Sequence, residues 1–486
     1  MRRFAAALAL FATSCASLEP AYVRPDPAIP PSWPTGDAYL RQSEATLPAV
    51  TYRDIFRDPR LQGLIGQALT NNRDLMVAAA NIAAARAQYR IQRANQLPQL
   101  SAAAAATVAG DKTKDVSADY QAGLQVPNFE IDLFGRLRSL SHAELQRYFA
   151  TEAAARATRL ALVADIAGAW LAYSADSSLL LIARQTADSA QKSVRLTRAR
   201  LEGGIAPRTD LSQALEVQTA AEADLSRQRT ALAQDINLLQ LLVGAPIDPK
   251  LLPNSIDEAA PTVAELPAGL DSYVLLRRPD VLEAEYQLRA ANAQIGAARA
   301  ALFPRITLTG LLGFASSALT KLFTGGAFGW SAGADATYTI FNAGAGRANV
   351  RLTEAQRAAA LATYQKAIQT AFREVSDALA RRGTIDDELG ARQRQQAAAA
   401  DVYVLSEARY KEGIDPFLAT LDSQRSYYST QQSVVQTKLT AAQNRVDLYH
   451  ALGGDSGLDP PPTTDVPAAT EVGLKETAAT ANSNQH

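Results

Sequence analysis

The chain has 486 residues, and its 48 Lys and Arg residues against 49 Asp and Glu residues give a formal net charge of −1. A nucleic-acid-binding protein carries a basic excess or a basic stripe, so this balance argues against that class. After the N-terminus, no run approaches the roughly 18 apolar residues of a membrane-spanning helix. If the chain enters a membrane, it must therefore do so with β-strands.

The first 14 residues have the pattern of an export signal. Arg2 and Arg3 form the positive region, an apolar stretch follows to Phe11, and small residues precede Cys15. Cys15 is the only cysteine, so it cannot form an internal disulfide. We therefore predict a lipoprotein that is cut before Cys15 and acylated there, although Ala12 stands where such signals usually have Leu. The alternative is a cysteine inside a discarded signal.

The first structural repeat is predicted at 59–245, after a Pro-rich arm at 15–58 that we expect to be extended. A helix should run from about Leu61 to Gln96 and end at the proline that follows. Strands are expected at 100–108 and 120–133. The apolar–polar alternation of the second strand changes phase at Pro127, which indicates a β-bulge or an exit from the sheet.

Very long helices should follow each pair of strands. The stretch from Gly135 to Glu202 has no proline, and at about 1.5 Å per residue it predicts a helix on the order of 100 Å long. After a break, a shorter helix at 210–243 carries leucines in a heptad register, which predicts coiled-coil packing. The abundant alanine permits close helix approach, as a closed helical tube requires. A solid bundle of long helices is the alternative.

The second half repeats the first. A linker at 246–264 leads to a second repeat at 265–453, and the polar tail at 454–486 is expected to be disordered. The run Arg200–Pro207 returns as Arg409–Pro416. The period is too long for a small-repeat solenoid, so we expect a pseudo-symmetric body.

The predicted strands suit a membrane barrel with a wet interior. Each is about the length of a tilted transmembrane strand, roughly 9–11 residues. Apolar residues alternate with polar or small residues, as lipid-facing and lumen-facing positions do. Two hairpins cannot close a barrel alone, because unpaired strand edges are not tolerated in lipid. Several chains must therefore contribute.

Chemistry-bearing motifs are scarce. His142, His450 and His486 are scattered, and no Cys/His spacing fits a metal site. Gly344 and Gly346 make half of a dinucleotide fingerprint, but Asn349 occupies the place of the third glycine. We find no convergent acid–base set and predict that the chain is not an enzyme and needs no cofactor or metal.

Four segments resemble the OprM and NodT-like lipoprotein branch of the TolC-type outer-membrane efflux factors. They are Cys15–Pro25, Leu266–Val281, Phe129–Arg136 and Tyr449–Gly454. The resemblance covers nearly all of the chain outside its tail. It implies a mainly α fold with a small β part, in which a homotrimer closes a transmembrane β-barrel from four strands per protomer. The helices continue as a hollow coiled-coil α-helical barrel across the periplasm.

The function implied by this resemblance is the exit duct of a tripartite efflux pump. Such ducts passively export drugs or other small molecules, and they work with a periplasmic adaptor and an inner-membrane transporter, most often of the RND type. A multidrug role is our first choice, and metal efflux or type I secretion are alternatives within this class. An exported periplasmic coiled-coil scaffold is the alternative outside it.

The resemblance also assigns a periplasmic aperture to Leu418, Asp422 and Arg425, which share one helix face at i, i+4 and i+7. A ring of Asp422 carboxylates repels anions and attracts cations. The alternative is a surface ion pair between Asp422 and Arg425, worth about 0–1 kcal/mol.

A latch between helix pairs is implied at Thr209, Asp210 and Tyr410. Asp415 stands where the family has an Arg, so that half of the latch is absent or rewired. The alternative role of Asp210 is to cap a helix start.

The two helix breaks are the implied adaptor-docking tips, at Gly203, Gly204, Glu412 and Gly413. Their alternative is simple turn geometry, since glycine tolerates positive φ.

Overall fold

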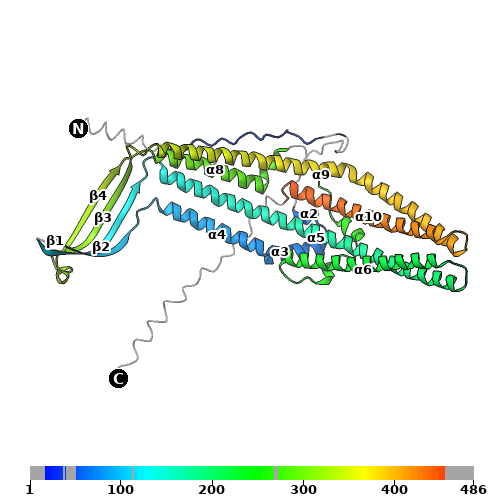
Figure 1. Ribbon diagram of the computed structural model, residues 1–486. Helices are drawn as coiled ribbons and strands as arrows, with labels where there is room; N and C mark the ends of the chain where they lie inside the picture. The colour runs from blue at the N-terminus through cyan, green and yellow to red at the C-terminus, as the bar shows by residue number, and fades with distance from the viewer. Residues whose placement is uncertain are drawn as a thin grey trace, which may run out of the picture.

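The computed structural model describes residues 17–34, 36, 39, 51–111, 114–266 and 272–454. The molecule is elongated, with a four-stranded sheet at one end and helices that run to two hairpin tips at the other (Figure 1). The predicted signal, Cys15 and the tail from residue 455 lie outside the described residues. In chain order the elements are α2 (Tyr52–Ile55), α3 (Pro59–Asn71), α4 (Arg73–Ala94), β1 (Ser101–Asp111), β2 (Lys114–Ile131), α5 (Arg136–Glu202), α6 (Arg208–Val243), η1 (Pro249–Leu251), α7 (Ile256–Ala259), η2 (Ala260–Thr262), η3 (Ser272–Arg277), α8 (Pro279–Ala300), β3 (Arg305–Ser316), η4 (Leu319–Lys321), β4 (Phe328–Thr337), α9 (Ala345–Lys411) and α10 (Phe417–Ala451).

The internal duplication is visible in the lengths of the elements. α4 and α8 have 22 residues each, α5 and α9 have 67 each, and α6 and α10 have 36 and 35. One strand pair lies between α4 and α5, and the other lies between α8 and α9. At about 1.5 Å per residue, α5 and α9 are each about 100 Å long, as the proline-free runs predicted.

The single helix expected from Leu61 to Gln96 is instead two helices, α3 and α4, and Asn72 is the cause. Its ψ of 132° is not helical. Its side-chain oxygen accepts hydrogen bonds from the backbone N–H of Asp74 (2.8 Å) and Leu75 (3.1 Å), and so caps α4. Its amide donates to the Leu242 carbonyl near the end of α6, at 2.8 Å. The break is therefore fixed by a contact with the far end of the same repeat.

The sheet joins the two repeats, because β2 pairs with β3 in the antiparallel order β1-β2-β3-β4. The register of this pair shifts between Val126 and Phe129, which confirms the bulge predicted at Pro127. β4, the last strand, has ten residues and ends at Thr337. β1 and β4 are the edges of the sheet, and all ten residues of β4 are exposed.

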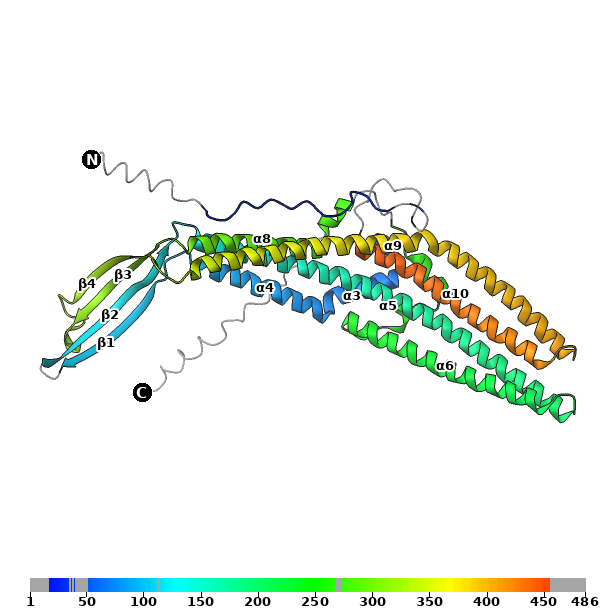
Figure 2. The ribbon, with the colours of Figure 1, turned by 45° about the horizontal axis from the view of Figure 1, so that its top comes forward.

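The main hydrophobic core lies at mid-length and draws on both repeats and the linker. Trp170 of α5 is fully buried and donates from Nε1 to the Leu251 carbonyl at 3.1 Å. The rings of Phe56 and Tyr449 meet edge to face at 5.3 Å. Phe56 belongs to the segment that we expected to be an extended arm, so the end of that arm is packed core instead. Beyond this level, α5–α6 and α9–α10 continue as two helical hairpins (Figure 2).

One helix corrects the expectation that no membrane-length apolar run exists. α5 contains an 18-residue window that is apolar enough to cross a membrane by length and composition alone. Half of that window is buried inside the structure, and α5 carries Ile166 and Trp170 of the core. The apolar run therefore reflects packing against α4, α6 and α8.

Residues 17–34 form an extended strap on one side of the helical layer, which we call the arm face. Glu19 accepts from His142 of α5 at 2.9 Å. Farther along, Arg24 donates two hydrogen bonds to Glu285 of α8, at 3.0 and 2.5 Å. Glu285 is only 2% exposed, and Arg289 also pairs with it, at 2.6 Å. These charge-assisted bonds hold the strap against α5 and α8.

Candidate duct and tip residues

The two hairpin tips share one backbone geometry. Gly204 and Gly413 have φ of 73° and 77°, a left-handed conformation that glycine adopts without strain. The N–H of the isoleucine that follows each one bonds the carbonyl five residues earlier, at 2.8 and 2.9 Å. The predicted tip residues Gly203, Gly204, Glu412 and Gly413 are all exposed there. The turn-geometry reading is therefore correct for Gly204 and Gly413, and adaptor docking stays a prediction.

The predicted aperture residues lie on the exposed side of α10, beside the tip. Leu418 is 49% exposed, and Asp422 and Arg425 are exposed as well. Arg425 pairs with Glu216 of α6 at 3.2 Å. Asp422 has no ion pair within the described part of the chain, so the alternative of an Asp422–Arg425 pair is wrong. The Asp422 carboxylate is left free to face water.

Tyr410 does not bond to Asp210, which corrects the predicted latch. Its hydroxyl is hydrogen-bonded to Thr197 of α5 at 3.2 Å, and its side chain is buried. The guanidinium of Arg200 lies 4.8 Å from the centre of the Tyr410 ring and donates to the Tyr410 carbonyl at 2.7 Å. Tyr410 therefore joins the α9–α10 hairpin to α5, because residues one helical turn apart on α5 grip both its hydroxyl and its ring.

Asp415, Asp210 and Thr209, the other residues at the predicted latch, lie within their own hairpins. Asp415 accepts two hydrogen bonds from Arg409, at 2.6 and 3.0 Å, and these bonds lower the pKa of Asp415. Asp210 is not the cap of α6, because the N-cap position is Pro207. It lies in the first turn, where a carboxylate is favoured by the helix dipole. Thr209 is exposed beside it.

Small apolar clusters, separate from the main core, hold the hairpins near their tips. One contains Val194, Ala214, Tyr410, Phe417 and Leu421. The rings of Tyr410 and Phe417 are 5.2 Å apart. α5, α6, α9 and α10 all contribute to this cluster, so it joins the two hairpins near their tips.

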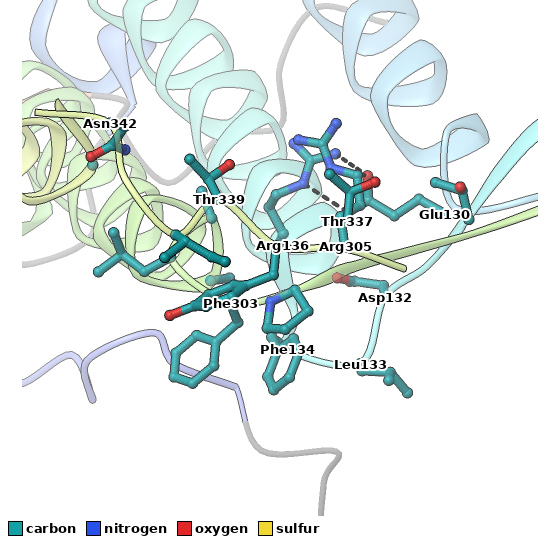
Figure 3. Close-up of a pocket in the computed structure, with 18 of the residues that line it drawn as sticks. Glu130, Asp132, Leu133, Phe134, Arg136, Phe303, Arg305, Thr337, Thr339 and Asn342 are labelled. Carbon is teal, nitrogen blue, oxygen red and sulfur yellow. Dashed lines mark hydrogen bonds and ion pairs between the residues drawn. The ribbon is translucent and has the colours of Figure 1, made fainter. Parts of the chain in front are cut away.

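A charged cavity of about 790 Å³ lies where the sheet meets the helices, and sequence reasoning missed it. Glu130 at the end of β2 accepts two hydrogen bonds from Arg136 at the start of α5, at 2.8 and 2.6 Å. Arg305 of β3 approaches the same carboxylate at 3.4 Å (Figure 3). Phe134 stacks on Phe303 at 4.6 Å beside them. The cluster ties β2 rigidly to α5 across the strand-to-helix turn.

The geometry of two strand pairs continuing into two very long helices matches a known family. The model described as outer membrane efflux protein matches residues 64–245 and 271–454, one segment in each repeat. The chain belongs to the outer membrane efflux protein family.

Relatives of this efflux protein match most of its length. The probable efflux pump outer membrane protein TtgC of Pseudomonas putida is 41% identical over 457 residues, covering 92% of this chain and 94% of the relative. The outer membrane protein OprJ of Pseudomonas aeruginosa is 40% identical over 454 residues, with coverage of 92% and 94%.

Solved structures agree with the fold. The open state of the MtrE outer membrane channel of Neisseria gonorrhoeae has a TM-score of 0.81 and 35% identity, and the match covers 91% of this chain and 99% of that one. A membrane protein from Pseudomonas aeruginosa has a TM-score of 0.84 and 38% identity, with coverage of 90% and 100%. The predicted family, fold class and outer-membrane location of this efflux protein are therefore confirmed.

Proposed function

We propose that this outer membrane efflux protein is the passive exit duct of a tripartite pump and works as a homotrimer. The observation that carries the proposal is the pair of free sheet edges. β1 and β4 each pair on one side only, and their open backbone groups would cost several kcal/mol each in lipid. Pairing β4 of one copy with β1 of the next satisfies both edges, and three copies give the twelve-stranded barrel that the family resemblance implies.

The alternation on β4 supports a wet lumen inside that barrel. Ala332, Ala334 and Ala336 share one face, and Ser331 and Asp335 share the other. Because α5 and α9 begin within a few residues of the strands, the lumen continues into the helical layer. The duct then narrows at the tip, where Leu418, Asp422 and Arg425 are exposed and three Asp422 carboxylates attract cations.

Partners and cargo belong to the same proposal. A periplasmic adaptor docks on the tips, where Ile205 and Ile414 are 72% and 61% exposed beside the tip glycines. An inner-membrane transporter, of the RND type, drives the pump. Two relatives from Pseudomonas putida are named an antibiotic efflux pump protein, ArpC, and a toluene efflux pump protein, TtgC, which supports drugs or other small molecules as cargo. The chain itself catalyses nothing.

The N-terminal arm is proposed to end in a lipid anchor at Cys15, after removal of residues 1–14. A Cβ placed on Gly135, at the base of the sheet, would lie 3.5 Å from the Cα of Ser17. Ser17 follows Cys15 by only two residues, and this supports an acylated end at the membrane boundary. The division into an arm at 15–58, repeats at 59–245 and 265–453, a linker at 246–264 and a tail at 454–486 is part of this proposal.

Single-channel conductance of the purified protein in planar bilayers, with its mass in detergent, tests the proposal. We expect a trimer with small, discrete currents that prefer cations. A closed aperture can silence a true channel, so heat-stable trimers are sought in outer-membrane fractions as well. A monomeric, water-soluble species without conductance would instead support a periplasmic scaffold.

A further inference from the structure

Five arginines that form no ion pair with a described residue gather where the helices approach the sheet. One of them, Arg86, interacts electrostatically with the Tyr148 hydroxyl of α5. Arg86, Arg90 and Arg93 lie at i, i+4 and i+7 on α4, and Arg347 and Arg351 lie at i and i+4 at the start of α9. All five side chains are exposed, and none has an ion pair or side-chain hydrogen bond to a described residue. In a chain whose net charge is −1, this is a local excess of positive charge.

The face on which these arginines lie follows from helix geometry. Leu75, Ile82 and Tyr89 mark the line along which α4 packs on α5. Successive residues are rotated by about 100° around the helix axis, so the three arginines of α4 are all rotated from this line in the same direction, by roughly 40–100°. Because α4 runs toward the sheet and α5 runs away from it, this offset points the stripe toward the arm face. On α9, Gly346 and Arg357 lie on the side that faces α8. Counting about 100° per residue from that side places Arg347 and Arg351 toward the arm face as well.

An apolar belt separates the arginines from the strands. Leu97 and Leu100, between α4 and β1, are 69% and 66% exposed, and Ile340 and Phe341, between β4 and α9, are 92% and 86% exposed. Apolar and aromatic side chains followed by arginines that reach back along the surface are typical of the boundary between hydrocarbon and headgroups. The chain has the same order of strand, apolar belt and arginine next to β1 and next to β4. These two segments lie where the sheet meets the helices (Figure 2).

We propose that Arg86, Arg90, Arg93, Arg347 and Arg351 form a basic collar that binds the headgroups of anionic glycerophospholipids on the periplasmic surface of the outer membrane. The inference rests on the proposed orientation of the duct, with the sheet in the membrane. Clusters of four to eight basic residues next to a membrane bind anionic lipid headgroups in this way. The bound phosphates neutralise the collar and fix the depth of the sheet in the bilayer.

A second copy of the chain does not supply the missing negative charge. The helices pack in the order α4, α5, α8, α9, so α4 and α9 are the outer edges that neighbouring copies bring together. Residues 84–100 and 338–353 contain no Asp or Glu. Glu354, the first acidic residue of α9, already pairs with Arg299 at 3.1 Å. Closing the trimer therefore brings the basic stripe of α4 next to that of α9 in the neighbouring copy. The repulsion between them increases, and a bound anion relieves it.

Native mass spectrometry of the full chain in uncharged detergent tests the collar. The probes are phosphatidylglycerol and phosphatidylcholine, and the readout is the number of lipids retained per chain. We expect the wild type to retain phosphatidylglycerol and little phosphatidylcholine, and the variant with all five arginines changed to Gln to retain about tenfold less phosphatidylglycerol. Rising ionic strength should weaken the binding.

Two further variants keep the test decisive. Changing five other exposed arginines far from the sheet to Gln, at Arg184, Arg195, Arg198, Arg229 and Arg394, should leave retention unchanged. Changing the collar to Lys should preserve most of it.

Three outcomes would overturn the proposal. The collar and control variants could retain equal amounts of phosphatidylglycerol, or excess inorganic phosphate could displace the lipid. The collar variant could also dissociate into monomers while each chain retains as much lipid as the wild type. Lipid retention does not depend on conductance, so failure of the collar and failure of the duct are separate results.

Discussion

At the scale of single residues, the proposed aperture depends on the charge of Asp422. It is exposed, and Arg425 is engaged by Glu216 instead of by Asp422. Removing Asp422 should therefore remove cation attraction, and removing Arg425 should remove its ion pair with Glu216 of α6. We expect the double change Asp422→Ala and Arg425→Ala to raise leak conductance in planar bilayers several-fold.

The matched control for the aperture changes Asp188 and Arg195, which are exposed on α5, to Ala. It alters the same charges away from the proposed constriction and should leave the leak at the wild-type level. Conductance that stays unchanged in the aperture variant would remove Asp422 and Arg425 from the constriction.

A second residue-scale prediction concerns Asp235 of α6, which faces Asp176 of α5. Burial, and then the charge of Asp176, raise the pKa of Asp235 to about 7. Its Oδ2 atom is buried and has no hydrogen-bond donor in the described structure. A proton shared by the two carboxyl groups satisfies that atom.

A raised carboxyl pKa means that the folded state binds the proton more tightly, so stability is lost as pH rises through about 7. We expect the Tm measured by circular dichroism to increase as pH falls from 8 to 5. Asp235→Asn should raise the Tm at pH 8 and flatten this dependence. Asp188→Asn, an exposed change of the same kind, should leave it intact; if both variants behave alike, the pair does not share a proton.

At the scale of elements, two glycines face each other where β2 pairs with β3. Gly123 lies opposite Gly313, and an added Cβ at Gly123 would lie 2.5 Å from the Leu312 carbonyl oxygen. The backbone would have to move, since the nearest atom is not a flexible side chain. We expect Gly123→Ala to cut the yield of heat-stable oligomers in outer-membrane fractions by more than half.

The control for this change is Gly310→Ala on β3, where the nearest atom to an added Cβ is the Ser331 carbonyl oxygen at 4.0 Å. Its yield should match the wild type. Normal assembly of Gly123→Ala would mean that the join between the two repeats is not limiting.

The elements themselves were largely predictable from the sequence, and the exceptions have physical causes. Proline-free runs and period-two alternation predict the long helices and the strands, because both are local signals. The break at Asn72 was missed, since no proline or glycine marks it and its amide is held by Leu242, far away in sequence. Phe56 was assigned to the arm by the proline content around it, yet it packs on Tyr449 near the end of the chain.

The candidate site was predictable only in part. Exposure of the tips and of the α10 face follows from helix breaks and helical spacing. The partner of Tyr410 depends on how α5 and α9 are rotated against each other, and no local pattern encodes that rotation. Glu130 and Arg136 are close in sequence, but their role appears only when the turn between them folds back and brings Arg305 to the same carboxylate.

At the scale of the whole molecule, the arm carries the remaining prediction. The strap at residues 17–34 is held against the helices by bonds to Glu285 and His142. These bonds do not depend on a lipid at Cys15. We therefore expect Cys15→Ser to abolish palmitate labelling while oligomers still form at close to wild-type yield. Labelling that survives the substitution would contradict acylation at Cys15, and loss of oligomers would show that the anchor, and not the strap, guides assembly.

The placement of the main core halfway along α5 has a mechanical consequence. From Trp170 to the end of the helix at Glu202 the chain advances about 50 Å. Beyond the main core, the described contacts between the hairpins are small apolar clusters and a few side-chain bonds, such as Tyr410–Thr197 and Arg425–Glu216. Each hairpin can therefore rotate as a rigid body about the core, and a tilt of about 5° there displaces its tip by about 4 Å. A partner that binds the tips therefore acts on the core through the full length of the hairpins.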